Sequence, residues 1–312
     1  MNLTVASSPH IRGNFRTNRI MLDVMLALTP ALGAGVWKFG PRALAVTFLC
    51  IACAVVTEYL FSLVTKTRNT VVDGSAAVTG MLLAMTLPAT VPYWQAGLGS
   101  VFAILCVKAL WGGLGQNVFN PALAARAFLL LIYPVGLTRY TVDGVTAATP
   151  LHHMVMPALP EESVLDMFLG NCPGSIGEIS ALALLLGGAY LMVRRVISPR
   201  IPAAYLATVA VLTLLFHRGQ PALSWMAYSL LGGGVMLGAL FMATDYATSP
   251  ATPSGQIVYG VGCGALTVLF RYYGIFPEGV TYAILIMNAL VWVIDRYAPV
   301  RRFGTKKGGA GK

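Results

Sequence analysis

The chain consists of apolar runs separated by short polar connections, and this pattern holds from residue 20 almost to the C-terminal end. A helix needs about 17 to 25 apolar residues to cross a membrane, and a shorter run suffices where other helices surround it. The pattern therefore predicts an all-α polytopic membrane protein with about ten transmembrane helices. We expect them near residues 20–36, 43–64, 74–88, 97–111, 120–136, 177–193, 201–216, 222–242, 256–270 and 279–294.

The basic residues indicate the direction of crossing, because Lys and Arg are enriched on the cytoplasmic face of membrane proteins. Ten crossings place both termini on one face. If that face is cytoplasmic, the outer segments hold only Lys38, Arg42, Arg139, Arg218 and Arg271. The inner segments then hold the basic tail with Arg296, and Arg12, Arg16, Arg19, Lys66, Arg68, Lys108, Arg194, Arg195 and Arg200. We therefore expect cytoplasmic termini, with residues 137–176 as the longest outer connection.

The composition supports membrane insertion and excludes a water-soluble core. Hydrophobic residues make up 57% of the 312 residues and charged residues 10%, and the mean hydropathy is +0.73. Soluble domains carry about 25% charged residues. The net charge of +10 gathers at segment ends and in the tail RRFGTKKGGAGK, so it is explained by topology and does not indicate nucleic-acid binding.

An internal repeat appears when the chain is aligned with itself at an offset of 158 residues. The alignment needs no gap between 74–97 and 232–255, and it places Thr86 on Thr244 and Pro92 on Pro250. Because each unit holds five helices, an odd number, the two units must enter the membrane in opposite directions, as in inverted-repeat transporters. We therefore assign residues 1–158 to the first five-helix repeat, joined to the outer loop 137–176. Residues 177–312 form the second repeat and the basic tail.

Two stretches predict broken helices in this 5+5 arrangement. Residues 80–97 and 238–255 each end a short apolar run in Thr and Pro. Interrupted backbone at membrane depth must be buried in protein or line a polar cavity. Functional sites are therefore expected near the interface between the two repeats.

Several ionisable side chains and possible metal ligands lie in or beside the predicted helices. Charge at membrane depth is costly and usually faces a partner or a cavity. Asp23, Glu58 and Asp73 are candidates for an ion pathway, and structural pairing is the alternative. Lys108, Arg126 and Glu178 are the other charged residues of this kind. No metal site is predicted, because the CxxC of Cys50 and Cys53 and the adjacent His152 and His153 lack further ligands at suitable spacing.

Five stretches in order carry a resemblance to a known family. They are NTVVDGSAAVTGMLLAMTLP (69–88), GGLGQNVFNPALAARAFLLL (112–131), DGVTAATPL (143–151), GSIGEISALALLLGG (174–188) and FMATDYATSPATPSG (241–255). On the ten-helix framework they resemble the family of membrane subunits that includes the D subunit of the Rnf ion-translocating electron-transport complex. The B subunit of the sodium-pumping NADH:quinone reductase is similar to that subunit. The resemblance covers almost the whole chain and implies a bacterial cytoplasmic membrane protein.

The resemblance gives a role to the outer segment TVDGVTAATPLHHM, residues 141–154, which is poor in charge and bulk. In this family an [ST]-x-A-T sequence holds FMN by a phosphoester bond to its last threonine. Thr146-Ala147-Ala148-Thr149 matches that sequence, with Ala147 where Gly is more usual, so the resemblance implies covalent FMN on Thr149. Small neighbours leave its hydroxyl open to a flavin transferase. For these four residues alone, a turn capped by Thr146 is the alternative.

The resemblance also implies a second flavin. Asn117 and Asn120 match asparagines that hold a non-covalent riboflavin in the related quinone reductase, and an amide can pair with the imide edge of a flavin ring. The alternative is that Asn120 caps the helix before Pro121 and Asn117 is exposed. Arg126 and Glu178 lie near the outer end, where they are expected to contact the FMN phosphate or each other.

The leading functional hypothesis is a membrane subunit that carries electrons on FMN within an ion-translocating ferredoxin:NAD oxidoreductase, coupled to Na⁺ or H⁺ transport. The chain has no nucleotide fold and no cysteine array, so it is expected to be inactive without the iron-sulfur and flavin subunits of the Rnf complex. A solute channel or transporter of similar fold is the alternative from another class. The same subunit in a complex that reduces a redox-sensing regulator is a third hypothesis.

Overall fold

The computed structural model describes residues 17–67, 70–138, 140–142, 145–147, 158–160, 162–274 and 279–298. The first half contains α1 (Thr17–Phe39), α2 (Pro41–Thr65), the 3-10 helix η1 (Val71–Asp73), α3 (Ser75–Thr86), α4 (Tyr93–Phe102), the π-helix η2 (Ala103–Ala109) and α5 (Pro121–Ile132). The long connection contributes α6 (Pro134–Thr138), an antiparallel hairpin of β1 (Tyr140–Val142) and β2 (Val145–Ala147), and α8 (Val164–Leu169). The second half contains α9 (Ala181–Val193), α10 (Arg200–Leu215), α11 (Ala222–Leu231), α12 (Val235–Leu237), the π-helix η3 (Gly238–Met242), α13 (Pro253–Tyr273) and α14 (Val280–Tyr297).

The helices confirm the predicted all-α polytopic membrane fold. Among the described residues, α1, α2, α13 and α14 are long and apolar enough to cross a membrane, and the bent pair Ala222–Leu231 and Val235–Met242 makes a fifth candidate. Shorter apolar helices are α3, α5, α9 and α10. Each of the ten predicted segments contains at least one helix. The β1–β2 hairpin is the only sheet in the part of the chain that the structure describes.

The predicted breaks after α3 and after η3 are both present. α3 ends at Thr86, and the chain turns through Pro88 and Pro92 before α4 begins. η3 ends at Met242, and the chain turns through Pro250 before α13 begins. Proline lacks the backbone N–H that a continuing helix needs, so it favours an end at these positions.

A third break was not predicted, and the expectation of one continuous helix over 222–242 was wrong. Glycines 232–234 separate α11 from α12, and the two parts are bent by 61°. Gly233 and Gly234 have φ of 61° and 66°, which glycine adopts at little steric cost. The buried Arg271 donates to the carbonyls of Ser229, Gly232 and Gly233 at 2.5, 2.7 and 2.9 Å. Arg271, expected in an outer segment, therefore caps the broken end of α11.

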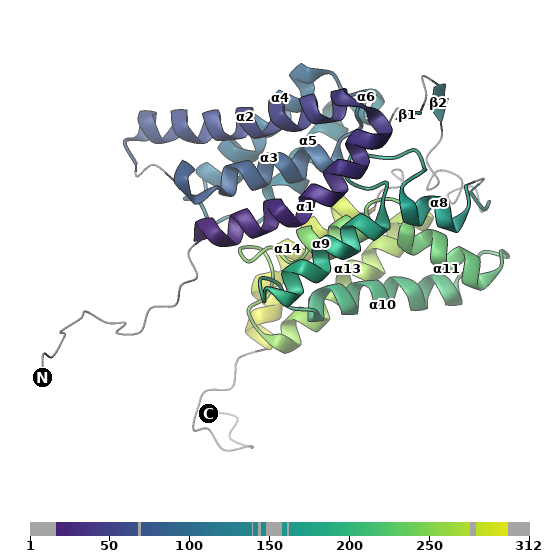
Figure 1. Ribbon diagram of the computed structural model, residues 1–312. Helices are drawn as coiled ribbons and strands as arrows, with labels where there is room; N and C mark the ends of the chain where they lie inside the picture. The colour runs from purple at the N-terminus through teal and green to yellow at the C-terminus, as the bar shows by residue number, and fades with distance from the viewer. Residues whose placement is uncertain are drawn as a thin grey trace, which may run out of the picture.

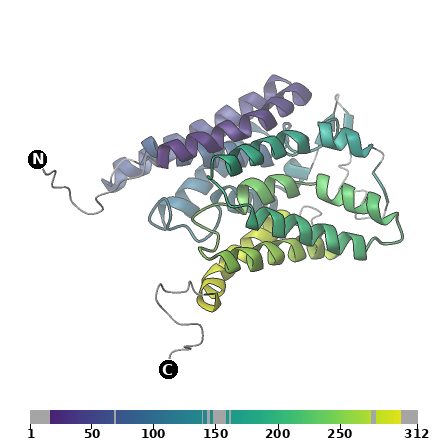
Figure 2. The same ribbon diagram turned by 60° about the horizontal axis from the view of Figure 1, so that its bottom comes forward.

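The inverted relationship of the repeats is visible where α1 packs against α9 (Figure 1 and Figure 2). The offset of 158 residues pairs these two helices as counterparts. Near its end, α1 approaches the chain before α9, since Gly35 lies against Ile176. In its first half, Ala27 lies against Gly187, well inside α9. As residue numbers rise along α1, the residues that it contacts in and before α9 have falling numbers. The two counterpart helices therefore run antiparallel.

The last helices of the two repeats, α5 and α14, also pack against each other and run antiparallel. At the start of α5, the backbone N–H of Asn120 donates to the side-chain oxygen of Asn288 at 3.1 Å, with the Asn288 amide oriented to satisfy its neighbours. Further along α5, Arg126 lines a cavity together with Thr281. Two counterpart pairs thus cross in opposite directions, as an inverted repeat predicts. The division of the chain at residue 158 stays a prediction, because residues 148–157 lie outside the described residues.

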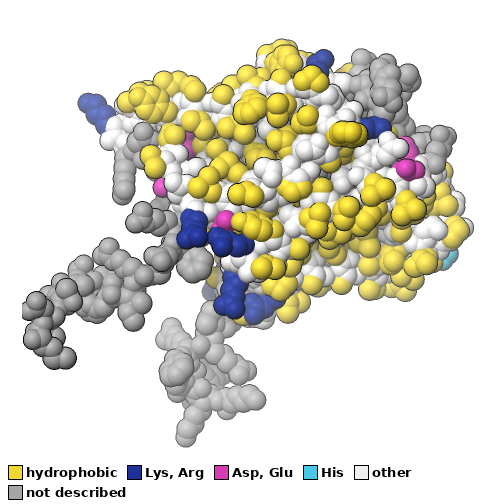
Figure 3. All heavy atoms as spheres, viewed as in Figure 1, with side chains coloured by type: hydrophobic (Ala, Val, Ile, Leu, Met, Phe, Trp, Pro, Cys, Tyr) yellow, Lys and Arg dark blue, Asp and Glu magenta, His cyan; other side chains and the backbone are white. Residues whose placement is uncertain are grey.

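The surface has the character expected in lipid. Figure 3 shows a face dominated by hydrophobic side chains, with many of its Lys and Arg side chains toward the end where α1 begins and α14 ends. The exposed cations Arg19, Lys66, Arg194, Arg195 and Arg200 all lie at or next to helix ends. α1 begins and α14 ends at one end of the bundle (Figure 1), as an even number of crossings requires.

Glycine permits a close backbone contact in the second repeat, between α10 and α13. A Cβ atom at Gly264 would lie 2.7 Å from Cβ of Thr208 and 2.9 Å from the carbonyl oxygen of Tyr205. A Cβ atom at Gly260 would lie 2.9 Å from the carbonyl oxygen of Ile201. Small residues at such positions let helix backbones approach closely in membranes.

We expect Gly264→Ala to lower the stability of the chain in detergent by about 1–3 kcal/mol, because the added methyl group overpacks a contact that includes backbone. The matched control is Gly33→Ala in α1, where a Cβ atom meets nothing within 4 Å. Thermal unfolding followed by tryptophan fluorescence measures both. Equal melting temperatures for the two variants would contradict the close packing of α10 on α13.

Candidate functional site

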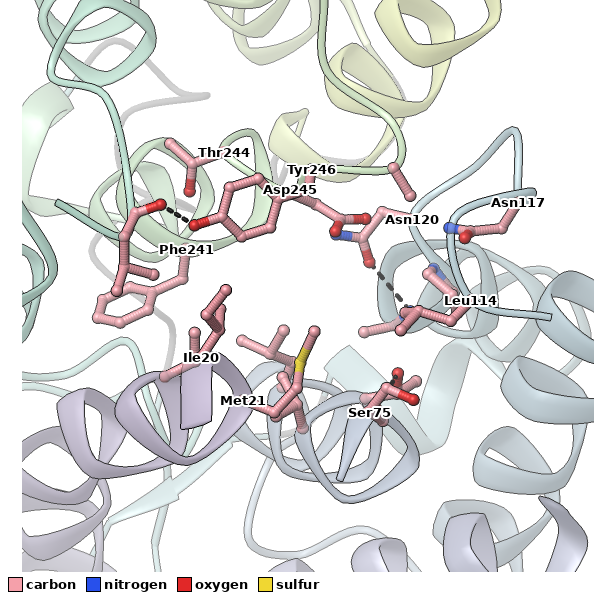
Figure 4. Close-up of a pocket in the computed structure, with 18 of the residues that line it drawn as sticks. Ile20, Met21, Ser75, Leu114, Asn117, Asn120, Phe241, Thr244, Asp245 and Tyr246 are labelled. Carbon is pink, nitrogen blue, oxygen red and sulfur yellow. Dashed lines mark hydrogen bonds between the residues drawn. The ribbon is translucent and has the colours of Figure 1, made fainter. Parts of the chain in front are cut away.

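A pocket opens between the two repeats near the start of α1 (Figure 4). It encloses about 760 Å³ of space including its open mouth. Ile20 and Met21 lie on one side, and Asp245 and Tyr246 lie on the opposite side. Its polar lining residues are Ser75, Thr79, Lys108, Asn117, Asn120, Thr244, Asp245 and Tyr246, and we call it the amide pocket.

Asn120 is placed in this pocket by its role at the start of α5. Its side-chain oxygen accepts from the backbone N–H groups of Ala122 and Leu123 at 3.1 and 3.3 Å. Its side-chain nitrogen donates to the carbonyl of Met242 at the end of η3, at 3.2 Å. The capping interpretation is therefore confirmed for Asn120, and the same side chain joins the two repeats.

Asn117 is buried, so its expected exposure under the capping alternative was wrong. Only 5% of the residue is exposed, and its nitrogen donates to the carbonyl of Phe119 at 3.0 Å. The structure shows no hydrogen bond from a described residue to its side-chain oxygen. Asn117 and Asn120 therefore reach one pocket, and Asn117 keeps the greater capacity to bind a ligand.

The opposite wall contains residues that the sequence analysis did not predict as site residues. Thr244, Asp245 and Tyr246 follow η3, within the FMATDYATSPATPSG stretch already noted for the repeat. Burial raises the pKa of the Asp245 carboxyl, which accepts from Thr248 Oγ1 at 3.2 Å. Tyr246 donates to the carbonyl of Val196. The signal available in the sequence was a charged residue directly after a broken helix.

A buried ion pair lies at the first-repeat side of the amide pocket. Lys108 Nζ is 2.7 Å from Glu58 Oε1 and donates to Ser75 Oγ at 2.6 Å. Thr70 also donates to Glu58 Oε1, at 2.7 Å. Glu58, predicted as an ion-pathway candidate, is thus held by a structural pair, which was the alternative.

The other ion-pathway candidates differ from Glu58 in their surroundings. Asp23 accepts from Tyr190 Oη at 2.9 Å and pairs with Arg194 at 3.2 Å, so it ties α1 to the end of α9. Asp73 ends η1 and is half-buried. No contact here tests whether any of these carboxylates lines an ion path, so that role stays a prediction.

A second, smaller cavity lies at the far end of the repeat interface. It encloses about 230 Å³ of space including the part open to solvent, and Arg126 and Glu178 line it with their side chains 2.9 Å apart. The structure brings these two predicted residues together, and both are buried. The Glu178 carboxylate lies beside Gly234, and Gly234 directly precedes α12. A carboxylate is favourable at a helix N-terminus. We call this space the Arg126 cavity.

The amide pocket and the Arg126 cavity are joined by two half-helices that run antiparallel. α3 begins with Ser75 in the amide pocket and ends with Thr86 in the Arg126 cavity. α12 and η3 begin after Gly234 in the Arg126 cavity, and Thr244 follows η3 in the amide pocket. Thr86 and Thr244, matched by the repeat, thus occupy equivalent places at opposite ends.

The predicted FMN site falls largely outside the described residues. Thr146 lies in β2, where its Cα is paired with Thr141 of β1. Thr149, His152 and His153 lie outside the described part of the chain. The covalent attachment therefore stays a prediction.

A second match to the same short sequence serves as an internal contrast. Ser249-Pro250-Ala251-Thr252 also reads [ST]-x-A-T. Thr252 is 4% exposed and its hydroxyl accepts from the backbone N–H of Gly255 at 3.0 Å, as the N-cap of α13. This hydroxyl is closed to a modifying enzyme.

We expect removal of one partner of the Glu58–Lys108 pair to lower the stability of the chain. Lys108→Met leaves a carboxylate buried without its partner, so unfolding free energy should fall by about 3–5 kcal/mol. The double variant Glu58→Met/Lys108→Met should recover most of that loss, because neither charge remains buried. Denaturant unfolding in detergent measures the cycle. A double variant as unstable as Lys108→Met would refute direct coupling of the two charges.

Comparison with known proteins gives matches over nearly the full length. The family model described as the NQR2, RnfD, RnfE family matches residues 4–304. The D subunit of the Na⁺-translocating ferredoxin:NAD⁺ oxidoreductase complex of Acetobacterium woodii is 49% identical, over 98% of this chain and 97% of its own. The proton-translocating counterpart of Clostridium ljungdahlii is 43% identical, over 97% of both chains. The D subunit of an ion-translocating oxidoreductase complex of Escherichia coli is 34% identical, over 99% of this chain and 100% of its own.

Proposed function

The chain belongs to the NQR2, RnfD, RnfE family, and we propose that it is the D subunit of an ion-translocating ferredoxin:NAD oxidoreductase complex that carries electrons on FMN bonded to Thr149. The observation that carries this proposal is the 49% identity to such a protein over 98% of the chain. The chain then acts only within the complex, and its relatives are named for coupling to Na⁺ or to protons.

The location of the Thr149 segment supports covalent FMN. The segment follows the β1–β2 hairpin, which lies at the opposite end of the bundle from the start of α1 (Figure 1). Bound FMN supplies the redox chemistry, and a phosphoester tether would keep the flavin from being lost between turnovers. The chain's contribution is a threonine hydroxyl preceded by Ala147 and Ala148, whose small side chains would leave it accessible to a transferase.

The lining of the amide pocket suits a second, non-covalent flavin. Ligand pockets are mostly apolar with a few placed polar groups, and the lining of this pocket has that character. The Asn117 oxygen has no described donor, so it can accept from an imide N–H, and its amide can donate to a carbonyl. The Lys108–Glu58 ion pair lies at one side of the same pocket, and apolar residues of α1 form part of its lining.

The orientation we propose has both termini in the cytoplasm of a bacterial cell. Exposed cations gather toward the end where α1 begins, and the amide pocket opens near that end. The hairpin and the flavin segment then face outward, as the excess of basic residues on the cytoplasmic face requires.

A channel is the rival function, favoured by the inverted repeat with its half-helices. The lining of both cavities, however, includes buried apolar side chains, such as Leu82 in the amide pocket and Leu123 and Met242 in the Arg126 cavity. A permeation path for polar solutes needs polar lining groups. The described interior favours the redox subunit over a solute channel.

The decisive test is covalent flavin on the denatured chain. When the complex is made with a flavin transferase, the wild-type chain should fluoresce on a denaturing gel, because a phosphoester survives unfolding. Thr149→Ala should abolish the signal, and Thr146→Ala should reduce it through weaker recognition. Peptide mass mapping should place one FMN on the peptide containing Thr149.

Thr252→Ala is the control for the second [ST]-x-A-T match. It should keep the full flavin signal, while the lost N-cap lowers stability by about 1 kcal/mol. If the wild-type chain carries no covalent flavin although an active transferase is present, the channel becomes the favoured function. A label on Thr252 would show that burial does not select the site.

A separate test concerns the amide pocket. Asn117→Leu should lower the non-covalent flavin that copurifies with the complex and leave covalent FMN unchanged. Asn117 is the better position than Asn120, because replacing Asn120 also removes the cap of α5. Val118→Leu, at the half-exposed neighbour outside the pocket, is the matched control. Extraction and chromatography of flavins give both amounts, and an unchanged riboflavin content in Asn117→Leu would exclude this site.

A further inference from the structure

One buried polar residue contacts both sides of the amide pocket without lining it. Asn288 lies in the middle of α14, within the apolar run ILIMNALVWVI (284–294), and only 2% of it is exposed. A buried amide at membrane depth is costly unless its oxygen and its nitrogen both find partners. The partners of Asn288 are groups of both repeats, and they belong to the two segments that carry the polar lining of the pocket.

The oxygen of Asn288 fixes the peptide group that holds Asn117. It accepts from the backbone N–H of Asn120 at 3.1 Å. The carbonyl of the same peptide group, on Phe119, accepts from the Asn117 side chain at 3.0 Å. Because a peptide group is planar, its N–H and its C=O are oriented together. The bond to Asn288 therefore sets the direction of the carbonyl that holds the Asn117 amide.

The nitrogen of Asn288 reaches the segment that carries Asp245. It donates to the carbonyl of Thr248 at 3.1 Å and to Tyr259 Oη at 2.6 Å. Thr248 in turn donates twice to Asp245, from its backbone N–H to the carbonyl at 3.3 Å and from Oγ1 to the carboxyl group at 3.2 Å. Thr248 and Tyr259 are 2% and 0% exposed, so bulk water does not compete for these bonds. The same amide thus anchors both segments.

We propose that Asn288 is a positioning residue of the riboflavin site, which holds Asn117 and Asp245 in fixed places across the amide pocket (Figure 4). The inference rests on the proposed second flavin. Binding groups need to be held within about 0.5 Å by neighbours whose own bonds fix them. Asn117 lines the pocket, whereas Asn288 acts through the peptide group and the turn that it bonds. The bond from Asn120 to Met242 joins the repeats at a second point, so losing Asn288 loosens the pocket without separating them.

The test uses the whole complex after its non-covalent flavin has been removed, and riboflavin is the probe. Asn288→Leu removes both hydrogen-bonding groups at similar volume, so riboflavin affinity should fall about tenfold, with covalent FMN unchanged. Asn288→Ser leaves room for a water molecule between the backbone groups, so it should fold even if Asn288→Leu does not. Its affinity should fall about threefold, because one hydroxyl replaces the amide. Quenching of riboflavin fluorescence on binding gives the affinities.

Thr267→Val is the matched control for a lost buried hydrogen bond. Thr267 lies in α13, is 0% exposed and bonds Tyr205 at 2.6 Å, and neither residue lines the amide pocket. This variant should be destabilised as the Asn288 variants are, and it should bind riboflavin as the wild type does.

Two further measurements separate positioning from a general loss of stability. The midpoint potential of bound riboflavin should shift in both Asn288 variants and stay at the wild-type value in Thr267→Val, because only the former change the groups around the ring. In the flavin-free complex, hydrogen exchange of peptides covering 117–123 and 245–248 should be faster in both Asn288 variants and unchanged in the control.

Wild-type affinity and potential in Asn288→Ser would overturn the inference, and so would equal losses in Thr267→Val. Failure of the flavin site itself gives a different result. If Asn117→Leu keeps its riboflavin, the amide pocket is not the flavin site, and the role of Asn288 falls with it. If Asn117→Leu loses riboflavin and neither Asn288 variant does, the site stands and only the role of Asn288 is wrong.

Discussion

Backbone carbonyl and amide groups at membrane depth cannot rely on water, so every break in a helix must be satisfied by another part of the chain. At the break after α11, Arg271 supplies the missing donors to three carbonyls. At the end of α3, the backbone amides of Ile176 and Gly177 donate to the carbonyls of Leu87 and Met85 at 3.0 and 2.9 Å. Each broken end is therefore tied to a segment far away in sequence. The bonds of Arg271 join two parts of the second repeat, and the bond from Gly177 to Met85 joins the two repeats.

The same constraint produces the cavities. A helix that stops inside the bundle leaves space beyond its end, and the two half-helices stop at opposite ends of the repeat interface. Side chains that satisfy the ends also line the spaces: Asn120 caps α5 and faces the amide pocket, while Glu178 lies before α12 and faces the Arg126 cavity. Polar groups required for folding are thus already in position to bind a ligand.

Four of the buried charged side chains in the described interior form two ion pairs. Glu58 with Lys108, and Arg126 with Glu178, are buried pairs at opposite ends of the interface. Such pairs contribute little net stability over apolar residues, yet either charge alone is costly. Arg126 with Glu178 at one end of the interface, and Asn120 with Met242 at the other, join the two repeats and restrict their relative movement.

The sequence by itself determined the order of the apolar segments and two of the helix breaks, because apolar length and proline positions act locally. It also determined the inverted repeat, since matched Thr and Pro residues and an odd helix count require it. Asn117 and Asn120 were recognised from their motif, but only the tertiary structure showed that Asn117 is buried and that Asp245 and Tyr246 face it from the other repeat. The break at Gly232 to Gly234 and its cap by Arg271 were likewise missed. These features depend on contacts between residues about 40 to 120 positions apart, which no local pattern encodes, because burial is decided by what packs against a side chain.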